Sequence, residues 1–567
     1  MLRDAQRPER GPGSLGAREF LLVLGGAFVL AAVMFWPLPL HLSRDIAHNT
    51  TDPLLQAWTV AWVGHALEHQ LSFWDANILF PNGDSLAFSE SLAGYAPVGL
   101  IGEGVGAAVA RYNLLFLFAY ALAVAGAYAL GRELGLSRAA ALVAGVAFAY
   151  SPWRWAQAGH LHIVASGAIP LSLALLVRGY RLGRPRAIVG GWLVVSWQVL
   201  IGLSLGLMLC YLLALLSAFV LVRWLRTGRP PVPRPIVFAT AGGVAAVLAA
   251  SVLVVPPYLR VADAHPEARR SLEQLRRFSP PLAGVVVAPT GNTVWGDLTE
   301  GVRSHFDEEP EQVLFPGLAT IALAMVGLVT GVFSRRLRWG LAVGALLAFL
   351  FSLGTTLLDG RLTYRLLYDY APGWSGIRTP GRLHTLTTLA LAMLAGAGLQ
   401  SLAERSKLLR FPRHRVALAT AAVAAVIVLA EGASWQLRAP GAGVIAGPSH
   451  PTVPRAPVGL AEAREPLVHI PPSHLNDFFF MIWSTDRFPR IVNGSTGFDP
   501  RKTVAIKDTL ETFPDKRSIT ALRRAAVRTV VFHRSFAQLE PEVETRPLDR
   551  LGVVRRPVGE VVLFELR

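Results

Sequence analysis

The sequence has a single cysteine, Cys210, among its 567 residues. One cysteine cannot form an intrachain disulfide or a thiolate metal cluster. Charged residues are scarce as well, at 16% of the chain, where soluble proteins carry about a quarter. Hydrophobic residues make up 52%, and this balance excludes an ordinary soluble protein and predicts a membrane protein. The 52 glycines and 39 prolines follow no period, which excludes collagen-like and low-complexity chains.

Lysine is nearly absent, although the chain is strongly basic. Its 54 basic residues include only Lys407, Lys502, Lys507 and Lys516, which leaves 50 arginines, and the formal net charge is +16. A nucleic-acid-binding protein would gather this charge on a soluble face with stacking aromatic residues. Here the arginines cluster in short loops between apolar runs, as they do in polytopic membrane proteins. We therefore expect membrane lipids, and not nucleic acid, as partners.

Apolar runs predict about eleven membrane crossings. They cover residues 20–40, 113–131, 139–152, 163–178, 187–203, 205–222, 236–256, 313–332, 339–356, 383–402 and 416–432. The first run is long enough to cross a hydrocarbon core about 30 Å thick. A cleaved signal peptide is the alternative, but its apolar region would be shorter and a small-residue cleavage site would follow, where this chain has Pro37, Pro39 and His41.

The positions of the basic loops predict the orientation. If the arginine-rich N-terminus is cytoplasmic, all five basic loops between later runs are cytoplasmic too, as the positive-inside rule requires. These loops are Arg132–Arg138, Arg178–Arg186, Arg223–Arg234, Arg335–Arg338 and Arg405–Arg415. The pattern is kept if residues 92–110, which contain Gly, Pro and Glu103, form an interfacial or re-entrant helix and not a span.

This orientation predicts a membrane domain and a soluble domain. The membrane domain covers residues 1–432 and includes two large outer loops, 41–111 and 257–311. The rest of the chain, 433–567, has an ordinary soluble composition and is expected on the extracytoplasmic face. Its strand-like runs at 467–470, 528–534 and 561–567, with helical spacing over 500–513 and 517–527, predict a small α/β domain. The predicted fold class is a mainly α, polytopic helical membrane protein with this domain appended.

The first outer loop holds three carboxylates that could act as a general base. Asp52 follows the first span and precedes an apolar stretch containing Trp58, and indole rings favour the membrane interface. The carboxylate is therefore expected at headgroup level, where it could deprotonate a hydroxyl group. Asp75 and Glu90 are the other candidates. The alternative for Asp52 is a helix N-cap before Pro53.

A second polar segment, Ser151–His162, is expected outside and contains Arg154, His160 and His162. These side chains could shape a pocket for a sugar and a phosphate. A zinc site would need further ligands that the pattern does not supply, so no metal or other cofactor is expected. The alternative is an interfacial loop whose aromatic and histidine side chains favour the membrane boundary.

A third segment, residues 372–386, places Arg378, Arg382 and His384 outside, against the charge bias of the other loops. Thr379 could cap a helix that has Pro380 in its first turn, so the positive end of the helix dipole would face the two arginines. Such an end binds anions, and guanidinium groups suit phosphate oxygens. A lipid phosphate is the expected anion. The alternative is anchoring to headgroups without catalysis.

Together these features resemble the GT-C superfamily of polytopic glycosyltransferases, which use polyprenyl-phosphate-linked sugars on the extracytoplasmic face. The resemblance rests on the layout of the chain and on three matches: the early Asp52, the Ser-Pro-aromatic-Arg segment Ser151–Arg154, and the Arg-x-Pro-x-Arg segment Arg378–Arg382. The first loop has no Asp-x-Asp pair and the tail has no Trp-Trp-Asp motif. These departures argue against a metal-dependent mechanism.

The resemblance implies an inverting glycosyltransferase of the bacterial inner membrane with Asp52 as the base. It further implies that Arg378, Arg382, His384 and Arg154 bind the donor phosphate, and that His160, His162, Asp75, Glu90 and Trp58 contact substrate. The acceptor would be a glycan, lipid or protein of the cell envelope. Two alternatives are a lipid-linked-sugar transporter, which should show charged residues within spans and related halves, and a non-catalytic membrane scaffold.

Overall fold

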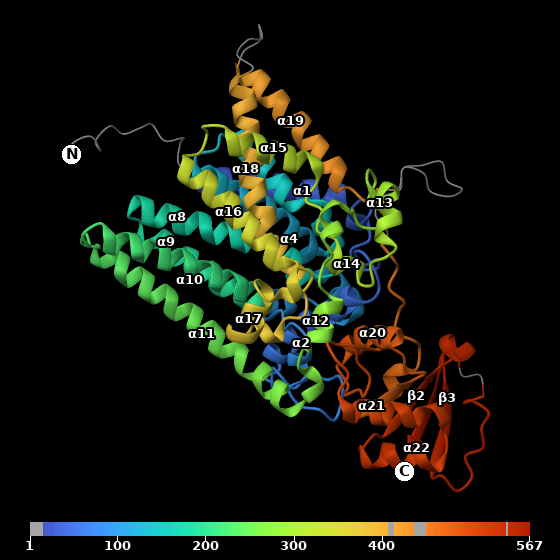
Figure 1. Cartoon of the computed structure of the whole chain (residues 1–567). Coiled ribbons are helices and arrows are strands. Elements are labelled where there is room, and N and C mark those ends of the chain that lie inside the picture. The colour runs from blue at the N-terminus through green and yellow to red at the C-terminus, as the bar shows by residue number, and fades with distance from the viewer. Residues whose placement is uncertain (1–14, 406–412, 436–449, 540–541) are drawn as a thin grey trace. The chain divides into compact units, whose positions relative to one another are not determined.

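The computed structural model describes residues 15–405, 413–435, 450–539 and 542–567 (Figure 1). The chain divides into two compact units. Unit 1 consists of Met1–Pro37, Phe116–Ser251 and Arg270–Pro448, and unit 2 consists of Leu38–Leu115, Val252–Arg269 and Ser449–Arg567. The basic start of the chain, residues 1–14, and the centre of the last basic loop, residues 406–412, lie outside the described residues.

Each of the eleven predicted apolar runs is helical. The helices are α1 (Ala17–Met34), α4 (Gly104–Leu134), α5 (Arg138–Ala149), α7 (Leu161–Val164) with α8 (Ala168–Leu182), α9 (Pro185–Ile201), α10 (Leu203–Arg226), α11 (Arg234–Ala264), α15 (Leu318–Val329), α16 (Arg335–Ser352), α18 (His384–Arg405) and α19 (Arg413–Gly432). In the described residues, six helical segments are long and apolar enough to cross a membrane. The protein is therefore an integral, multi-pass membrane protein, while the count of eleven crossings stays a prediction.

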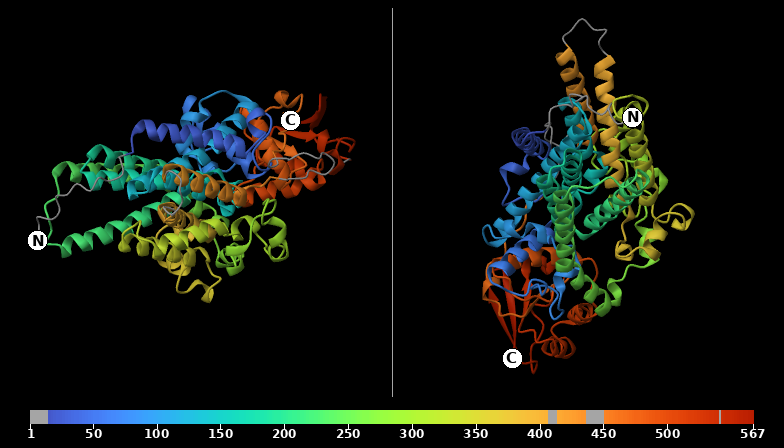
Figure 2. Two further views of the ribbon diagram at one scale, coloured as in Figure 1. Left: turned by 90° about the horizontal axis from the view of Figure 1, so that it is seen from above. Right: turned by 90° about the vertical axis from the view of Figure 1, so that its left-hand side faces the viewer.

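Helix α18 packs against α5, α15, α16 and α19 in unit 1. In Figure 2, α18 and its neighbour α19 are the pair of orange helices that reach the top of the right-hand view. Glycines let α15 and α18 approach closely: a Cβ atom at Gly327 would overlap the carbonyl of Leu394, and one at Gly398 would overlap that of Leu323. Small residues at helix crossings are a common way to pack helices within membranes.

Short helices fill the loops between the long ones. They are α2 (Asp52–Glu68), α3 (Ala96–Gly99), α6 (Pro152–Ala156), α12 (Leu272–Arg277), α13 (Gly296–Arg303), α14 (Glu309–Gln312) and α17 (Tyr364–Tyr370). The segment 92–110, predicted as one interfacial or re-entrant helix, is divided. Its first part holds α3, the chain turns at Gly102 and Gly104, where φ is positive, and the rest continues into α4. Glycine tolerates this left-handed backbone, so the two residues break the helix.

The C-terminal part of unit 2 is the predicted α/β fold. Four strands, β1 (Leu467–Ile470), β2 (Thr529–His533), β3 (Val553–Val558) and β4 (Val561–Leu566), form a sheet in the order β1-β2-β4-β3. β1 and β2 are parallel, and the other pairs are antiparallel. The helices are α20 (His474–Trp483), α21 (Arg501–Asp508) and α22 (Lys516–Arg524). Phe532, Phe564 and Leu522 belong to its hydrophobic core.

Two of these elements were not predicted. β3 reads VVRRPV, and its two arginines and proline weaken the strand pattern. The structure accommodates them because β3 is an edge strand, where proline is tolerated. Helix α20 reads HLNDFFFMIW, whose aromatic run resembles a strand, but Ser473 begins the helix by accepting a hydrogen bond from the Asn476 N–H at 3.0 Å.

Candidate functional site

A buried ion pair lies at the start of α18. Arg382, in the 3-10 turn Pro380–Leu383 that leads into the helix, faces Glu311 of α14. Its Nη2 donates to Oε1 of Glu311 at 2.6 Å, and its Nε lies 3.2 and 3.4 Å from the two carboxylate oxygens. Glu311 is 5% exposed. Burial raises the pKa of its carboxyl, but the attraction of Arg382, His160 and Arg378, together with the hydrogen bond from Arg382, outweighs burial, and the net pKa is lowered.

Both predicted histidines of the Ser151–His162 segment adjoin this pair. Arg382 Nη1 lies 3.1 Å from His162 Nε2, and because arginine can only donate, that nitrogen accepts and the imidazole is neutral. His160 Nε2 lies 4.0 Å from Glu311 Oε1, and the two imidazole rings are 5.9 Å apart. The structure therefore brings together His160, His162 and Arg382, which lie in two distant segments of the sequence.

Two more arginines belong to the same cluster. Arg378 lies over the Phe278 ring, with 4.7 Å between its guanidinium carbon and the ring centroid. Arg270 is close enough to Arg378 and Arg382 to feel their charges. Burial, and after it the repulsion from these two guanidinium groups, lowers the pKa of Arg270 to about 10, so Arg270 remains protonated at neutral pH. We call Arg270, Arg378 and Arg382, together with Glu311, the arginine cluster.

Gly381 allows the backbone before α18 to approach the backbone of α14 closely. A Cβ atom at this position would lie 2.5 Å from the backbone carbonyl oxygen of Glu311 and 3.1 Å from Pro280. Any larger residue would push the two segments apart. The Thr379-Pro380-Gly381-Arg382 sequence therefore positions the Arg382 side chain and permits the close approach of the backbone that carries Glu311.

His384 does not point into the arginine cluster. It is fully buried, with Trp153 and Phe349 on either side at ring centroid distances of 5.5 and 6.3 Å. The structure also corrects the expected helix start, because α18 begins at His384 and Pro380–Leu383 form a 3-10 turn before it. Thr379 precedes that turn without a capping hydrogen bond from its side chain. Phosphate binding by His384 stays a prediction.

Arg154 stabilises the loop in which it lies. It is 1% exposed, and its guanidinium donates to Ala149 O at 3.1 Å, to Ser166 Oγ at 2.5 Å and to Val164 O at 2.5 Å. These bonds join the end of α5 to the chain that follows α7, and so they hold the segment that carries His160 and His162. Burial lowers the pKa of Arg154 to about 10. Its predicted contact with a donor phosphate stays a prediction.

Asp52 and Trp58 belong to unit 2, on helix α2. The N-cap of α2 is Thr51, and Asp52 is the first helical residue; the alternative of Asp52 as the N-cap is therefore wrong. A carboxylate in the first turn is favoured by the helix dipole. Trp58 is 1% exposed, and its indole donates to Asn77 Oδ1 at 3.1 Å, so it is a packed residue of the interior. Base catalysis by Asp52 and substrate contact by Trp58 stay predictions.

Asp75 and Glu90, the other acidic candidates, lie in the loop after α2. Asp75 accepts hydrogen bonds from Ser72 Oγ at 2.7 Å and from the Asp84 N–H at 2.8 Å, so it closes a turn. Glu90 is half-buried, and Tyr258 holds the backbone on either side of it, donating to Ser89 O and accepting from the Ser91 N–H. Substrate contacts by both residues stay predictions.

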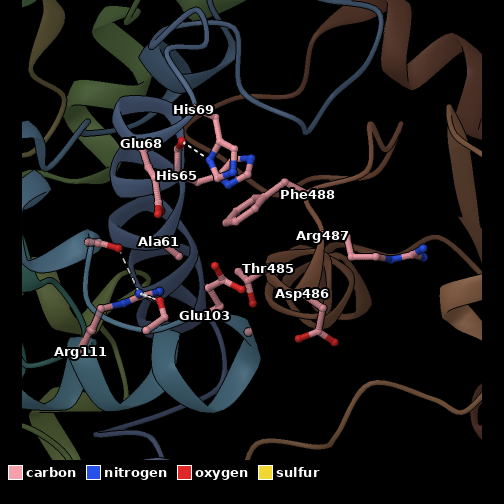
Figure 3. A pocket seen from close by; sticks show the side chains of 13 residues that line it. Ala61, His65, Glu68, His69, Glu103, Arg111, Thr485, Asp486, Arg487 and Phe488 are labelled. Carbon is pink, nitrogen blue, oxygen red and sulfur yellow. Dashed lines mark hydrogen bonds between the residues drawn. The ribbon is translucent and has the colours of Figure 1, made fainter.

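A cavity of about 280 Å³ lies within unit 2 (Figure 3). Ionisable side chains line much of it: His65, Glu68, His69, Glu103, Arg111 and Asp486. Phe488 stacks on His65 with 4.2 Å between ring centroids. The cavity adjoins the C-terminal end of α2, about 20 Å from Asp52 by the rise of 1.5 Å per residue in a helix. It is therefore separate from the carboxylate that the sequence singles out.

Sequence reasoning missed two members of the arginine cluster. Glu311 lies in the acidic run Asp307–Glu311, and Arg270 in a stretch that also holds Arg269, Arg276 and Arg277. The signal for Arg270 was present, since these arginines break the charge bias of an outer loop just as Arg378 and Arg382 do. Nothing in the sequence distinguishes Glu311 from Glu308 or Glu309, because only the tertiary fold selects which carboxylate meets Arg382.

The chemistry of the cluster suits an anion. Three guanidinium groups lie near one another, and one of them, that of Arg382, contacts a carboxylate and a histidine. Guanidinium groups match the oxygens of phosphate. Within the described residues, no group of three or more His, Cys, Asp or Glu side chains is arranged to hold a metal ion.

No protein-family model matches the sequence, and no curated protein matches it. Among solved structures, the polytopic helical fold is that of the GT-C glycosyltransferases. The likeness that carries this assignment is to the arabinofuranosyltransferase AftD from mycobacteria, with a TM-score of 0.54 at 16% sequence identity. It covers 98% of this chain and 42% of the AftD chain, so this chain spans less than half the length of that protein. The predicted resemblance is confirmed at the level of the fold.

Two other solved structures match at lower TM-scores. One is the oligosaccharyltransferase AglB from Archaeoglobus fulgidus in complex with an inhibitory peptide and a dolichol-phosphate, at 0.45 and 14% identity, covering 93% of this chain and 70% of that one. The other is ArnT from Cupriavidus metallidurans bound to undecaprenyl phosphate, at 0.36 and 13% identity, covering 97% and 98%.

Proposed function

We propose that the protein is a membrane glycosyltransferase that moves a sugar from a polyprenyl-phosphate donor to an acceptor of the cell envelope. The observation that carries the proposal is the arginine cluster at the start of α18, in a chain whose fold is that of AftD. Guanidinium groups match the oxygens of a phosphate monoester, which is the group that leaves when such a donor gives up its sugar.

In the proposed reaction, an acceptor hydroxyl oxygen attacks the anomeric carbon of the sugar, and the bond from that carbon to the phosphate oxygen breaks. The electron pair of the broken bond stays on the phosphate, where Arg270, Arg378 and Arg382 stabilise the developing negative charge. Asp52 is the proposed base that takes the proton of the hydroxyl group. A single displacement of this kind inverts the configuration of the anomeric carbon.

Within the cluster, Glu311 and His162 are proposed to hold Arg382 in one rotamer, because both contact its guanidinium. His160 is proposed to contact the sugar or phosphate, since it lies beside the carboxylate of Glu311 and is partly exposed. Arg154 is proposed to act as a positioning residue that fixes the loop of these histidines.

The proposed orientation has a cytoplasmic N-terminus, a membrane domain to about residue 432 and a soluble part on the extracytoplasmic face. It rests on the five basic loops, which are cytoplasmic together or not at all. Fusing a periplasm-dependent phosphatase after residue 567 and, separately, after residue 228 tests it. We expect activity from the first fusion only, and the reverse result would invert the orientation.

The test of the function is a transfer assay in lipid nanodiscs with a panel of polyprenyl-phosphate sugars, run beside a binding assay with undecaprenyl phosphate. Asp52→Asn should abolish transfer and keep lipid-phosphate binding, because it removes the base and not the cation cluster. The matched control is Asp263→Asn, whose carboxylate is 83% exposed in the same unit and which should keep both activities. Unchanged transfer in Asp52→Asn would remove Asp52 from the mechanism. Binding with no transfer across the panel would favour a transporter or scaffold.

A further inference from the structure

Helix α17 lies in the segment that joins two apolar helices, α16 and α18. Four large side chains in and before it are unusually exposed: Leu358 at 71%, Leu362 at 70%, Leu366 at 45% and Tyr370 at 82%. Leu366 and Tyr370 share one face of α17, and Leu358 and Leu362 lie in the chain just before it. Exposed apolar side chains gathered in one segment mark an interaction surface.

The opposite face of α17 is packed, so the exposed stripe is a defined side of an ordered helix. Tyr364 is fully buried, its ring centroid is 5.7 Å from that of Trp374, and its hydroxyl donates to Ile377 O at 3.1 Å. One turn later, the Tyr368 hydroxyl donates to Arg270 O at 2.5 Å. The helix therefore has one face toward the arginine cluster and one face of aliphatic and tyrosine side chains that the chain leaves uncovered.

Basic and polar side chains border the stripe. Arg361 is exposed beside Leu362. Asp359 binds Arg276 at 3.1 Å and Arg365 at 3.0 Å, which fixes the turn that carries Leu358. Apolar residues on one face with arginine at the border are typical of helices that lie in the plane of a membrane interface.

We propose that the α17 stripe, defined as Leu358, Leu362, Leu366 and Tyr370, is seated in the lipid bilayer at the boundary between headgroups and acyl chains. Lipid is the partner that we expect to cover the stripe, because of where the stripe lies between α16 and α18 in the chain. The stripe begins six residues after α16 ends at Ser352, and α18 begins at His384. The segment 353–383 thus leads directly into the helical segment Pro380–Arg405, which is long and apolar enough to cross a membrane. Tyrosine is also enriched at this depth of the membrane.

If the stripe contacts lipid, α17 connects the membrane surface to the arginine cluster. Through the hydroxyl groups of Tyr364 and Tyr368, α17 holds the backbone of Ile377, next to Arg378, and the backbone of Arg270. Two of the three arginines of the cluster are therefore positioned by a helix whose outer face contacts lipid. The proposal concerns this contact alone and holds whether or not the chain transfers a sugar.

The experiment uses the single cysteine of the chain. In the full-length Cys210→Ser protein, Leu362→Cys and Tyr370→Cys are labelled separately with an environment-sensitive fluorophore and reconstituted into vesicles of phosphatidylcholine and phosphatidylglycerol. Fluorescence is quenched either by lipids that carry a spin label near the headgroup or by aqueous iodide. Val458→Cys, in unit 2 and 68% exposed, is the control for an exposed apolar position that is not part of the stripe.

We expect the lipid-borne quencher to reduce the fluorescence at positions 362 and 370 at least about threefold more than at 458, and iodide to act mainly at 458, because an interfacial helix buries its apolar face below the headgroups. Iodide quenching at 362 and 370 equal to that at 458 would place the stripe in water and overturn the proposal. Protection from both quenchers would also overturn it, since a protein surface and not lipid would then cover the stripe. Circular dichroism of each labelled protein verifies that it is folded.

Discussion

The guanidinium of Arg382 meets the carboxylate of Glu311 at 2.6 Å although the two residues are 71 positions apart in the sequence. The pair is buried, with 5% of Glu311 exposed, and it orders the guanidinium of Arg382. Five predictions test this arrangement and the residues that support it.

Glu311→Gln should destabilise the protein and impair transfer. The substitution keeps the size of the side chain but leaves Arg382 buried without its counter-charge, and breaking one side of a buried ion pair costs about 3–5 kcal/mol. Thermal unfolding in detergent should show a lower Tm. Glu300→Gln, at an exposed position of α13, is the matched control and should leave Tm unchanged. Equal Tm values for the two variants would show that the pair contributes no stability.

The same pair predicts a dependence of stability on pH. The pKa of Glu311 in the folded protein lies below its ordinary value of 4.5. A carboxyl with a lowered folded pKa contributes stability that is fully present above the ordinary pKa and is lost as pH falls through the folded pKa. We therefore expect the Tm difference between wild type and Glu311→Gln to be constant from neutral pH to about pH 5.5 and to shrink below the ordinary carboxyl pKa. A difference that stays constant down to pH 3 would contradict this account.

Gly381→Ala should disrupt the arginine cluster, because it moves the backbone that carries Arg382. The new Cβ atom would lie 2.5 Å from the carbonyl oxygen of Glu311, so α14 and the turn before α18 must separate, and overpacking of this kind costs roughly 1–3 kcal/mol. We expect a lower Tm and weaker binding of undecaprenyl phosphate. Gly376→Ala lies in the same loop, where a Cβ atom meets nothing within 4 Å, and it should behave as wild type.

Arg270→Ala should weaken lipid-phosphate binding, while Arg269→Ala should not. The two arginines are neighbours, but only Arg270 is held near Arg378 and Arg382, whereas the side chain of Arg269 is 67% exposed and lies 3.7 Å from Asp263. Removing one cation from a phosphate site costs about 1.5–3 kcal/mol when the charge-assisted hydrogen bond is lost, which is a tenfold or greater rise in Kd. Identical Kd values for the two variants would exclude Arg270 from the anion site.

Arg154→Lys should lower Tm without changing the affinity for the lipid phosphate. Lysine keeps the charge but cannot reproduce the three directed bonds to Ala149, Ser166 and Val164. The exposed Arg184→Lys is the control for the substitution itself. If Arg154→Lys raises Kd for undecaprenyl phosphate at an unchanged Tm, Arg154 contacts the phosphate directly and its proposed positioning role is wrong.

Much of the architecture could be predicted because it depends on patterns within short stretches. The apolar runs became helices α1, α4, α5, α7 with α8, α9, α10, α11, α15, α16, α18 and α19, and the runs near 467, 529 and 561 became strands β1, β2 and β4. Arg378 and Arg382 indicated the start of α18, since the predicted orientation puts them outside and positive charge on that side needs a local reason.

The sequence by itself determined the class of protein, the helical layout and the segments that carry unusual charge, since hydropathy and charge bias are local properties of the chain. Only the tertiary structure decided that Glu311, and not Glu308 or Glu309, pairs with Arg382, that Arg270 joins the cluster, and that His384 is packed among aromatic rings. The physical reason is that these contacts depend on how helices pack. The close approach at Gly381 brings together residues far apart in the chain, and no periodic pattern encodes such a meeting.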